Sequence, residues 1–204
     1  MSSQAINIDR PLAAVCVYCG SSELADPSLM EAAERLGAAI ARSDRRLVYG
    51  GGGVGLMGAC ARGAAAAGGR VLGVIPEFLT DVEQPPMGAQ TVVVSSMHER
   101  KMRMFEEADA FAVLPGAIGT LEEVIELLSW RRLALHAKPV VFYNPAGFWD
   151  PLFELFSRFI DSRLLPAAFS ACWREVSDIE AVLPTLASMP TDVFPPSPRM
   201  ATLV

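Results

Sequence analysis

The sequence predicts an α/β protein in which a doubly wound parallel sheet is covered by helices on both faces, a three-layer α/β/α arrangement. Short apolar runs of strand length, such as residues 13–19, 47–49 and 71–75, alternate with longer segments of helical periodicity. Each of the first two runs ends in a loop rich in glycine or serine, where ligands bind in such sheets. The 204 residues suit one domain, residues 1–204, because we find neither an internal repeat nor a linker.

The elements follow one another in the order that a Rossmann-like fold requires. We expect strands at residues 13–19, 47–49, 71–75, 91–94, 111–114, 139–143 and 173–176. We expect helices at residues 27–43, from the second glycine loop to 68, at 97–108, from 119 or 120 past 130, and at 147–162. Residues 76–90 read as a lid or rim loop, the aromatic residues of 147–162 look exposed, and the tail from Met189 reads as a loose arm or a strap over a neighbour.

Composition excludes several classes of function. A net charge of −6 argues against a nucleic-acid surface, which must neutralise phosphates. No apolar run reaches the roughly 18 to 20 residues of a membrane helix, and the N-terminus lacks the pattern of a signal peptide. The four cysteines suggest no disulfide framework, and Cys16 and Cys19 point to opposite faces of a strand. We therefore expect a cytoplasmic protein with buried, reduced thiols, no nucleic-acid partner and no membrane contact.

The stretch from Phe111 to Trp130 organises the chain. A buried strand runs into a turn, residues 115–120, and a helix opens there, so its free backbone N–H groups can hold a phosphate. At about 100° per residue, Glu123 shares a face with the apolar Leu127 and Trp130, whereas Glu122 does not. A carboxylate on an apolar stripe is costly unless it has a partner, so Glu123 is the candidate for chemistry.

The helix at 97–108 carries the second unusual group. Lys101 lies among methionines and Phe105, with Arg100 at the edge of that face. A lysine in this setting needs either a route to water or an anionic partner. Arg100 and Lys101 together could bind a phosphate or a carboxylate, or they could form a solvated pair beside a core stripe.

The second glycine loop contains G-x-G-x-x-G at Gly53, Gly55 and Gly58, between a strand and a helix. That context permits a dinucleotide site, but the motif follows the second strand rather than the first, and Glu77 follows a proline. Tight packing of strand against helix, with some phosphate or ribose contact, is the preferred interpretation.

Four segments together resemble the LONELY GUY (LOG) family of cytokinin riboside 5′-monophosphate phosphoribohydrolases, often mislabelled as lysine decarboxylases. They are residues 18–22, residues 51–58, Met97-His98-Glu99-Arg100-Lys101, and PGAIGTLEE at 115–123. The similarity extends from Val15 to about Trp173. The family pattern PGGxGTxxE has Ala117 here in place of its second glycine, and an alanine there requires a negative φ or tolerates strain.

The resemblance implies hydrolysis of the N-glycosidic bond of a cytokinin nucleotide or AMP, with release of base and ribose 5-phosphate. It implies that Arg100 and Glu123 are the catalytic pair. It further implies no cofactor, no metal and a homodimer or larger assembly. The substrate contacts that it implies are Glu83, Lys101, Gly116, Ala117, Ile118, Gly119, Thr120, Leu121, Glu122 and Ser129.

Two alternatives stay open beside this hydrolase. A non-catalytic nucleotide-binding or carrier protein of the same fold would keep the glycine loops but could dispense with Arg100 and Glu123. A pyridoxal phosphate decarboxylase needs a Schiff-base lysine, and the only lysines are Lys101 and Lys138, neither in the expected setting. The helix after residue 119 also has apolar residues on two sides, Leu121 and Ile125 on one and Leu127 and Trp130 on the other, which favours a partner subunit.

Overall fold

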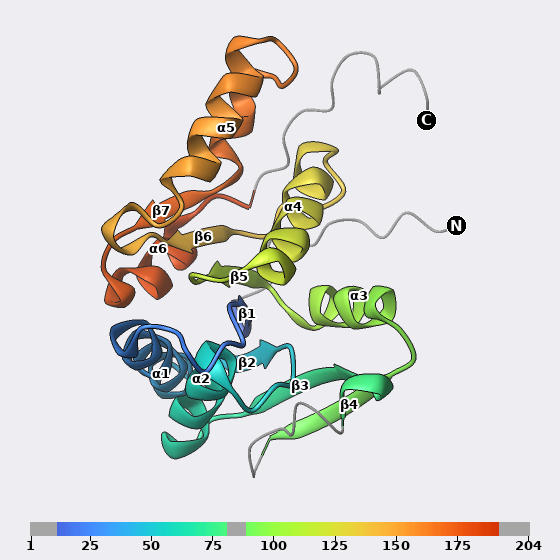
Figure 1. The fold of residues 1–204 in the computed structure, drawn as a ribbon, viewed down its shortest axis with the longest axis vertical. Helices are drawn as coiled ribbons and strands as arrows, with labels where there is room; N and C mark the ends of the chain where they lie inside the picture. The colour runs from blue at the N-terminus through green and yellow to red at the C-terminus, as the bar shows by residue number, and fades with distance from the viewer. Residues whose placement is uncertain (1–11, 81–88, 192–204) are drawn as a thin grey trace.

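A computed structural model describes residues 12–80 and 89–191, and these contain a seven-stranded sheet in the order β4-β3-β2-β1-β5-β6-β7, with every neighbouring pair parallel (Figure 1). The chain winds outward from β1 to β4, then crosses to β5 and winds the other way. The predicted doubly wound sheet is confirmed. The strands are β1 (Ala14–Tyr18), β2 (Arg46–Tyr49), β3 (Val71–Pro76), β4 (Gln90–Val94), β5 (Ala110–Val113), β6 (Val140–Tyr143) and β7 (Arg174–Val176).

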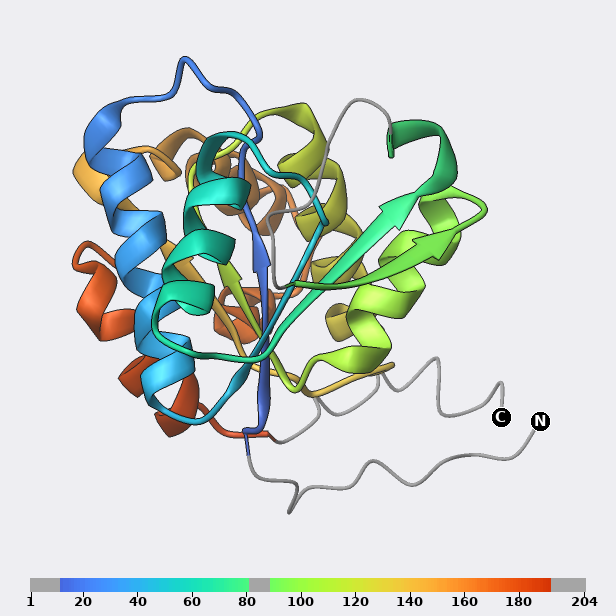
Figure 2. The same cartoon turned by 90° about the horizontal axis from the view of Figure 1, so that it is seen from below.

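Helices cover both faces of the sheet (Figure 2). One face packs against α1 (Pro27–Arg42), α2 (Gly55–Ala66) and α6 (Val182–Ser188). The other packs against α3 (Met97–Glu107), α4 (Ile118–Arg132) and α5 (Asp150–Asp161). Short 3-10 turns lie at Glu77–Leu79, Pro145–Gly147, Ala167–Cys172 and Ile179–Ala181. The winding reverses between the paired strands β1 and β5, so this switch point lies in the middle part of the sheet.

Small residues let α1 and α2 approach closely. A Cβ at Gly37 would lie 1.9 Å from the carbonyl oxygen of Cys60, and one at Gly63 would lie 2.0 Å from that of Glu34. The small-residue helix that the sequence predicted is therefore a packing requirement, since any side chain at these two positions would force the helices apart.

Several sequence expectations at the C-terminal end were wrong. The helix expected at 147–162 begins at Asp150, and its aromatic residues mostly pack inward around Trp173, with Phe153 stacked on that ring at 5.5 Å. Helix α6 was missed, and Met189 after it is buried, so the chain is anchored at this point. The rest of the expected strap, from residue 192, lies outside the described residues, as does most of the expected lid loop, residues 81–88.

All four cysteines are free and buried, as predicted. In the described part of the chain, no helix combines the length and the apolar character needed to span a bilayer.

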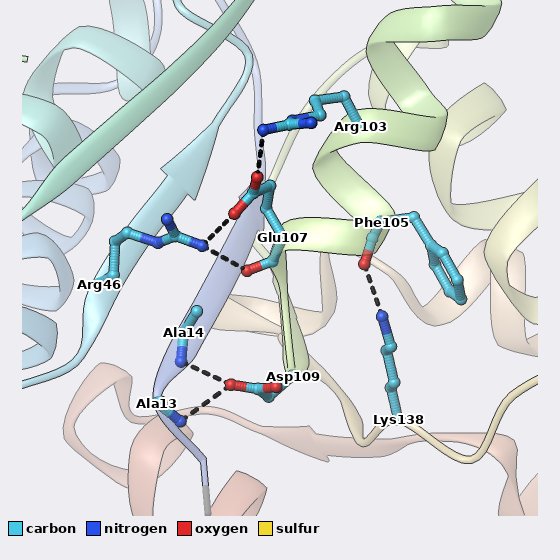
Figure 3. A network of polar contacts seen from close by, with 8 residues as sticks. All are labelled: Ala13, Ala14, Arg46, Arg103, Phe105, Glu107, Asp109 and Lys138. Carbon is cyan, nitrogen blue, oxygen red and sulfur yellow. Dashed lines mark hydrogen bonds and ion pairs between the residues drawn. The ribbon is translucent and has the colours of Figure 1, made fainter. Parts of the chain in front are cut away.

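A polar network lies at the amino ends of the strands, on the opposite side of the sheet from the glycine-rich loops (Figure 3). The C-terminal end of α3 has no basic residue of its own in its last turn, so cations from other elements bind its carbonyl groups. Arg46 donates to the Glu107 carbonyl at 3.0 Å, and Lys138 donates to the Phe105 carbonyl at 2.6 Å. Asp109 accepts from the backbone N–H groups of Ala13 and Ala14. The network ties the end of α3 to β1, β2 and the start of β6.

His136 is a buried, neutral histidine between α4 and β6. Its Nδ1 accepts the Lys138 N–H at 3.2 Å, which assigns the proton to Nε2, 2.9 Å from the Leu127 carbonyl oxygen. Burial lowers the pKa of His136 to about 4, although the Leu127 carbonyl works in the opposite direction. Its pKa in the unfolded chain is the ordinary 6.5.

We predict that this histidine makes the fold sensitive to acid. Because the folded state resists protonation, its contribution is complete above pH 6.5, falls as the pH drops, and is lost below about pH 4. The loss amounts to about 3 kcal/mol. Urea unfolding should therefore show the stability of wild type falling relative to His136→Gln across this window. If the free energies of unfolding of wild type and His136→Gln differ by the same amount at every pH, the assignment is contradicted.

Candidate active site

A cavity of about 130 Å³ opens at the carboxyl ends of the strands, at the switch point between β1 and β5. The loops after β1, β2 and β5 meet there, and the first and last are tied by a hydrogen bond from the Gly20 N–H to the Pro115 carbonyl at 3.1 Å. The starts of α3 and α4 complete the wall. The lining residues are Val17, Cys19, Gly20, Ser21, Gly50, Met57, Met97, Arg100, Met104, Ala117, Gly119, Thr120 and Glu123.

Arg100 is held by carbonyl groups of β3 and of the loop after β2. It extends from the first turn of α3 and is only 8% exposed. Its Nε donates to the Val74 carbonyl at 3.2 Å and its Nη2 to the Gly50 carbonyl at 3.1 Å. The sequence placed Arg100 at the edge of an apolar face, whereas the structure buries it beneath the cavity, because these carbonyl groups satisfy its donors.

Glu123 lies one and a half turns into α4 and is likewise 8% exposed. Its Oε1 is 3.6 Å from Arg100 Nη1. The prediction that a carboxylate on this apolar stripe needs a partner is confirmed, and the partner is Arg100. Removing one member of a buried ion pair typically costs about 3–5 kcal/mol, so neither charge is an incidental feature of the surface.

The start of α4 has the features of an anion-binding turn. Ala117, at its N-cap, has no side chain that could cap the helix, and the first turn contains no acidic residue. Its backbone at φ −100° is extended, so alanine fits where the family pattern has glycine, and no strain follows. Ala117, Gly119 and Thr120 line the cavity. Gly116 packs behind them, where a Cβ would lie 2.2 Å from Thr120 Oγ1.

The remaining predicted contacts lie elsewhere. Lys101 contacts Glu122 and, at 3.0 Å, Glu126, and none of the three lines the cavity among the described residues. Ile118 is 79% exposed and Ser129 is exposed on the outer side of α4. Leu121 is partly buried against the core beneath α4. Glu83 lies outside the described residues.

Sequence reasoning did not predict that Gly50 and three methionines, Met57, Met97 and Met104, line the cavity. A Cβ at Gly50 would lie 1.9 Å from Arg100 Nη2 and 3.0 Å from Met57 Sδ, so the absence of a side chain makes room for the guanidinium. Gly50 is the first of four consecutive glycines, and this run was the sequence signal that could have identified it. At the end of the same loop, a Cβ at Gly55 would lie 2.4 Å from the Ser21 carbonyl carbon, so this glycine of the G-x-G-x-x-G motif is tightly packed, whereas the expected phosphate or ribose contact stays a prediction.

The described residues give little support to a metal site or to a cysteine nucleophile. Among 12–80 and 89–191, no three His, Cys, Asp or Glu side chains gather into a group that could hold a metal ion. Burial raises the pKa of the Cys19 thiol well above its ordinary value, so the one sulfhydryl lining the cavity stays protonated at neutral pH and is a poor nucleophile.

Comparisons with known proteins identify relatives by sequence. A family model described as "Possible lysine decarboxylase" matches residues 57–186. The rice cytokinin riboside 5′-monophosphate phosphoribohydrolase LOG is 45% identical over 149 residues, 72% of this chain and 60% of the rice protein. The cytokinin riboside 5′-monophosphate phosphoribohydrolase of Rhodococcoides fascians is 46% identical over 140 residues, 68% of this chain and 71% of that protein. The chain thus spans about three fifths of the rice relative's length.

A solved structure of similar shape is the molybdenum cofactor binding protein from Rippkaea orientalis, with a TM-score of 0.65 over 87% of this chain and 97% of that one. At 24% sequence identity this likeness shows a shared fold and nothing about the ligand.

We predict that Gly50→Ala disrupts the site from outside the ion pair. The added methyl group overlaps the Arg100 guanidinium, which must leave its present position. A core clash of this kind costs about 1–3 kcal/mol. Thermal unfolding should show a lowered Tm, whereas Gly119→Ala, whose Cβ meets no atom within 4 Å, should not lower it. Equal Tm values for the two variants would contradict this account of Gly50.

Proposed function

The chain belongs to the LOG family of cytokinin riboside 5′-monophosphate phosphoribohydrolases, and we propose that it hydrolyses the N-glycosidic bond of a nucleoside 5′-monophosphate. The products are the free base and ribose 5-phosphate. The observation that carries the proposal is the buried Arg100–Glu123 pair, which borders the same cavity as the start of α4. We also propose that the protein works in the cytoplasm and that residues 1–204 form one domain.

The start of α4 supplies the phosphate site in this proposal. The backbone N–H groups at Ile118, Gly119 and Thr120 belong to the first turn of the helix, where N–H groups have no partner within the helix and the helix dipole is positive. Because that turn has no acidic residue, an approaching phosphate meets no like charge there. The proposed phosphate site is therefore the backbone of residues 117–120.

Glu123 then faces the reacting ribose. Breaking the bond from C1′ to the base leaves the bonding electrons on the base and positive charge on the ribose ring. A carboxylate fixed beside the ring stabilises this charge and can take a proton from the attacking water, whose oxygen forms the new bond to C1′. Glu123 lies about 8 Å along α4 from its first residue, at a helical rise of 1.5 Å per residue. The phosphate and the reacting carbon thus have separate sites on one helix.

Arg100 serves to orient Glu123. A guanidinium holds its protons far above neutral pH, so it is a poor general acid. Its hydrogen bonds to Val74 and Gly50 fix it in place, and its positive charge lies 3.6 Å from the buried Glu123 carboxylate. In the resting site Arg100 thus offsets the negative charge on which the reaction depends.

A lysine decarboxylase is disfavoured by the positions of the two lysines. Lys101 is bound to Glu122 and Glu126, and Lys138 binds the Phe105 carbonyl with its Nζ 3.8 Å from the centre of the Phe105 ring. Neither lysine lines the cavity among the residues described. A carrier protein of the same fold is the other alternative, and it has no need of a buried carboxylate facing its ligand.

We predict that the wild-type protein releases adenine from AMP without added cofactor and that Glu123→Gln abolishes this release. The amide keeps the size of the side chain but removes its charge, which should cost about 10²- to 10³-fold in kcat and leave the Kd for AMP largely unchanged. Glu122→Gln, the matched variant on the exposed side, should lose much less. The assay measures released base from AMP, CMP and isopentenyladenosine monophosphate, beside an AMP titration. Binding without turnover in the wild type would favour the carrier protein.

We also propose a homodimer or larger assembly, because α4 leaves an apolar stripe uncovered. Trp130 packs edge-on against Phe105 at 5.2 Å, so that side of α4 is covered by the chain itself. The uncovered side carries Ile118 and Ile125, 79% and 37% exposed, about two turns apart, with the partly buried Leu121 one turn from each. Such a stripe is typical of a subunit contact.

We predict that Ile125→Glu weakens this assembly. A charge in the middle of an apolar contact loses its hydration, so sedimentation should show a shift from dimer or larger species toward the monomer. The control is Leu164→Glu, an equally apolar and 69% exposed position outside α4, which should leave the sedimentation profile unchanged. A wild-type protein that sediments only as a monomer at micromolar concentration would refute the proposal.

A further inference from the structure

The three methionines that line the cavity differ sharply in their exposure to solvent. Met57 is 7% exposed and Met104 is 1% exposed, whereas Met97, at the start of α3, is 38% exposed. A methionine sulfur is oxidised only where an oxidant can reach it. Of these three side chains, Met97 is therefore the one that a small oxidant in solution meets first.

The Met97 sulfur contacts the cation of the buried ion pair. Its Sδ lies 4.0 Å from Arg100 Nη1 and accepts a weak hydrogen bond from it. The same Nη1 lies 3.6 Å from Oε1 of Glu123. The other two guanidinium nitrogens, Nε and Nη2, donate to the carbonyl groups of Val74 and Gly50. A chemical change at Met97 thus acts on the nitrogen that faces the carboxylate.

Oxidation would place a strong acceptor beside this nitrogen. A peroxide transfers one oxygen atom to Sδ as its O–O bond breaks; the sulfur loses two electrons, and the second oxygen leaves as water. The thioether becomes a sulfoxide, which is polar and accepts hydrogen bonds far better than the original sulfur. Because a methionine side chain is unbranched and flexible, the new oxygen can reach Arg100 Nη1 at about 2.9 Å, an ordinary hydrogen-bond length.

A sulfoxide oxygen in this position competes with Glu123 for the guanidinium. The carboxylate oxygen is 3.6 Å from Nη1, which is longer than a hydrogen bond, so an acceptor at hydrogen-bond length takes the N–H. In the proposed mechanism Arg100 orients Glu123. A displacement of about 1 Å in such a site can cost about 10²-fold in rate, so a shift of the guanidinium toward Met97 would slow turnover.

The cysteines are poor targets for the same oxidant. All four are buried, and burial raises the pKa of the Cys19 thiol, which lines the cavity, well above its ordinary value. Peroxides react with the thiolate, so a protonated and buried thiol reacts slowly. A loss of activity in dilute peroxide can therefore be assigned to a methionine rather than to Cys19.

We propose that Met97 is an oxidative modification site, at which a peroxide lowers turnover by forming a sulfoxide that draws Arg100 away from Glu123. A methionine sulfoxide reductase reverses the step: a dithiol becomes a disulfide, the sulfur regains two electrons, and the oxygen leaves as water. The effect on turnover rests on the proposed hydrolase function, whereas the oxidation of Met97 does not.

The first experiment treats the wild-type protein with hydrogen peroxide, locates added oxygen by peptide mass spectrometry and measures adenine released from AMP. As Met97 gains one oxygen, kcat should fall by about tenfold or more. Methionine sulfoxide reductase should restore kcat, whereas dithiothreitol alone, which reduces disulfides and sulfenic acids, should not. Activity that falls while Met97 stays unoxidised, or that dithiothreitol restores, would overturn the proposal.

The second experiment removes the sulfur as Met97→Leu, a substitution that nearly conserves volume. Each variant is compared with its own untreated activity, so that any effect of the leucine itself cancels. Met97→Leu should keep its untreated kcat in peroxide. The matched control is Met102→Leu, in the same helix, because Met102 is partly buried and is not among the described residues that line the cavity. It should lose activity as the wild type does, and equal losses in both variants would overturn the proposal.

A third variant, Met97→Gln, imitates the sulfoxide without any oxidant. Glutamine is unbranched and carries a neutral carbonyl oxygen that accepts hydrogen bonds. Its kcat for AMP should be about tenfold below that of Met97→Leu, with little change in KM, because the proposed phosphate site at the start of α4 is untouched. Equal kcat values for the glutamine and leucine variants would contradict the role assigned to the oxygen.

The two proposals fail in different ways. A wild-type protein that releases no base contradicts the hydrolase, and mass spectrometry then decides the modification site alone. Faster oxidation of Met97 than of Met57 and Met104, slowed by bound AMP, supports that site, because Met97 is the exposed member of the cavity wall. Oxidation of Met97 no faster than of Met104 overturns it. A protein that keeps full activity with Met97 oxidised overturns the effect on turnover and leaves the hydrolase standing.

Discussion

The site depends on one buried ion pair, Arg100–Glu123, and on the backbone carbonyl groups that make it possible. Burying two charges is costly, and their mutual attraction at 3.6 Å does not by itself offset the loss of hydration. The carbonyl groups of Val74 and Gly50 satisfy two further donors of the guanidinium. Gly50 directly follows β2, and Val74 lies in β3 one residue beyond the last position that pairs with β2. The sheet therefore supplies the solvation that water would otherwise give to Arg100.

Several distant features serve to keep this pair in place. Gly50 lacks a side chain where the guanidinium lies, and the loop of glycines allows α2 to begin close to Ser21. The C-terminal end of α3 is fixed by Arg46 and Lys138, which lie at the amino ends of the strands. The helix that carries Arg100 is thus held at its end by the polar network, at its start by the Ser96 cap, and along its side by α4.

The sequence was sufficient for the fold and for singling out Glu123 as a buried charge that needs a partner, because both rest on local signals, whereas the catalytic role of Arg100 and Glu123 stays a prediction. Strand and helix periods alternate, and Glu123 stands out as a charge on an apolar stripe. The partners of Lys101 could not be predicted, since Glu122 and Glu126 are 21 and 25 positions away and their approach depends on how two helices lie on the sheet. Helix α6 was missed because seven residues containing a proline give too short a periodic pattern. Of the candidate contacts, Ala117, Gly119 and Thr120 do line the cavity with the pair, whereas the role of Glu83 stays a prediction.

The arrangement of charges along α4 explains how one helix can serve both ends of a nucleotide. A phosphate requires positive potential, and a ribose that develops positive charge requires negative potential. The helix dipole gives the first at residues 118–120, and Glu123 gives the second about one turn later. The two requirements would conflict if the carboxylates were unpaired, because they would then repel the phosphate. Arg100 offsets Glu123 and Lys101 offsets Glu122 and Glu126, so the acids just beyond the first turn are each paired with a cation from α3. The adjacent cations of α3 thus allow the proposed anion site and the proposed catalytic carboxylate to lie within two turns of a single helix.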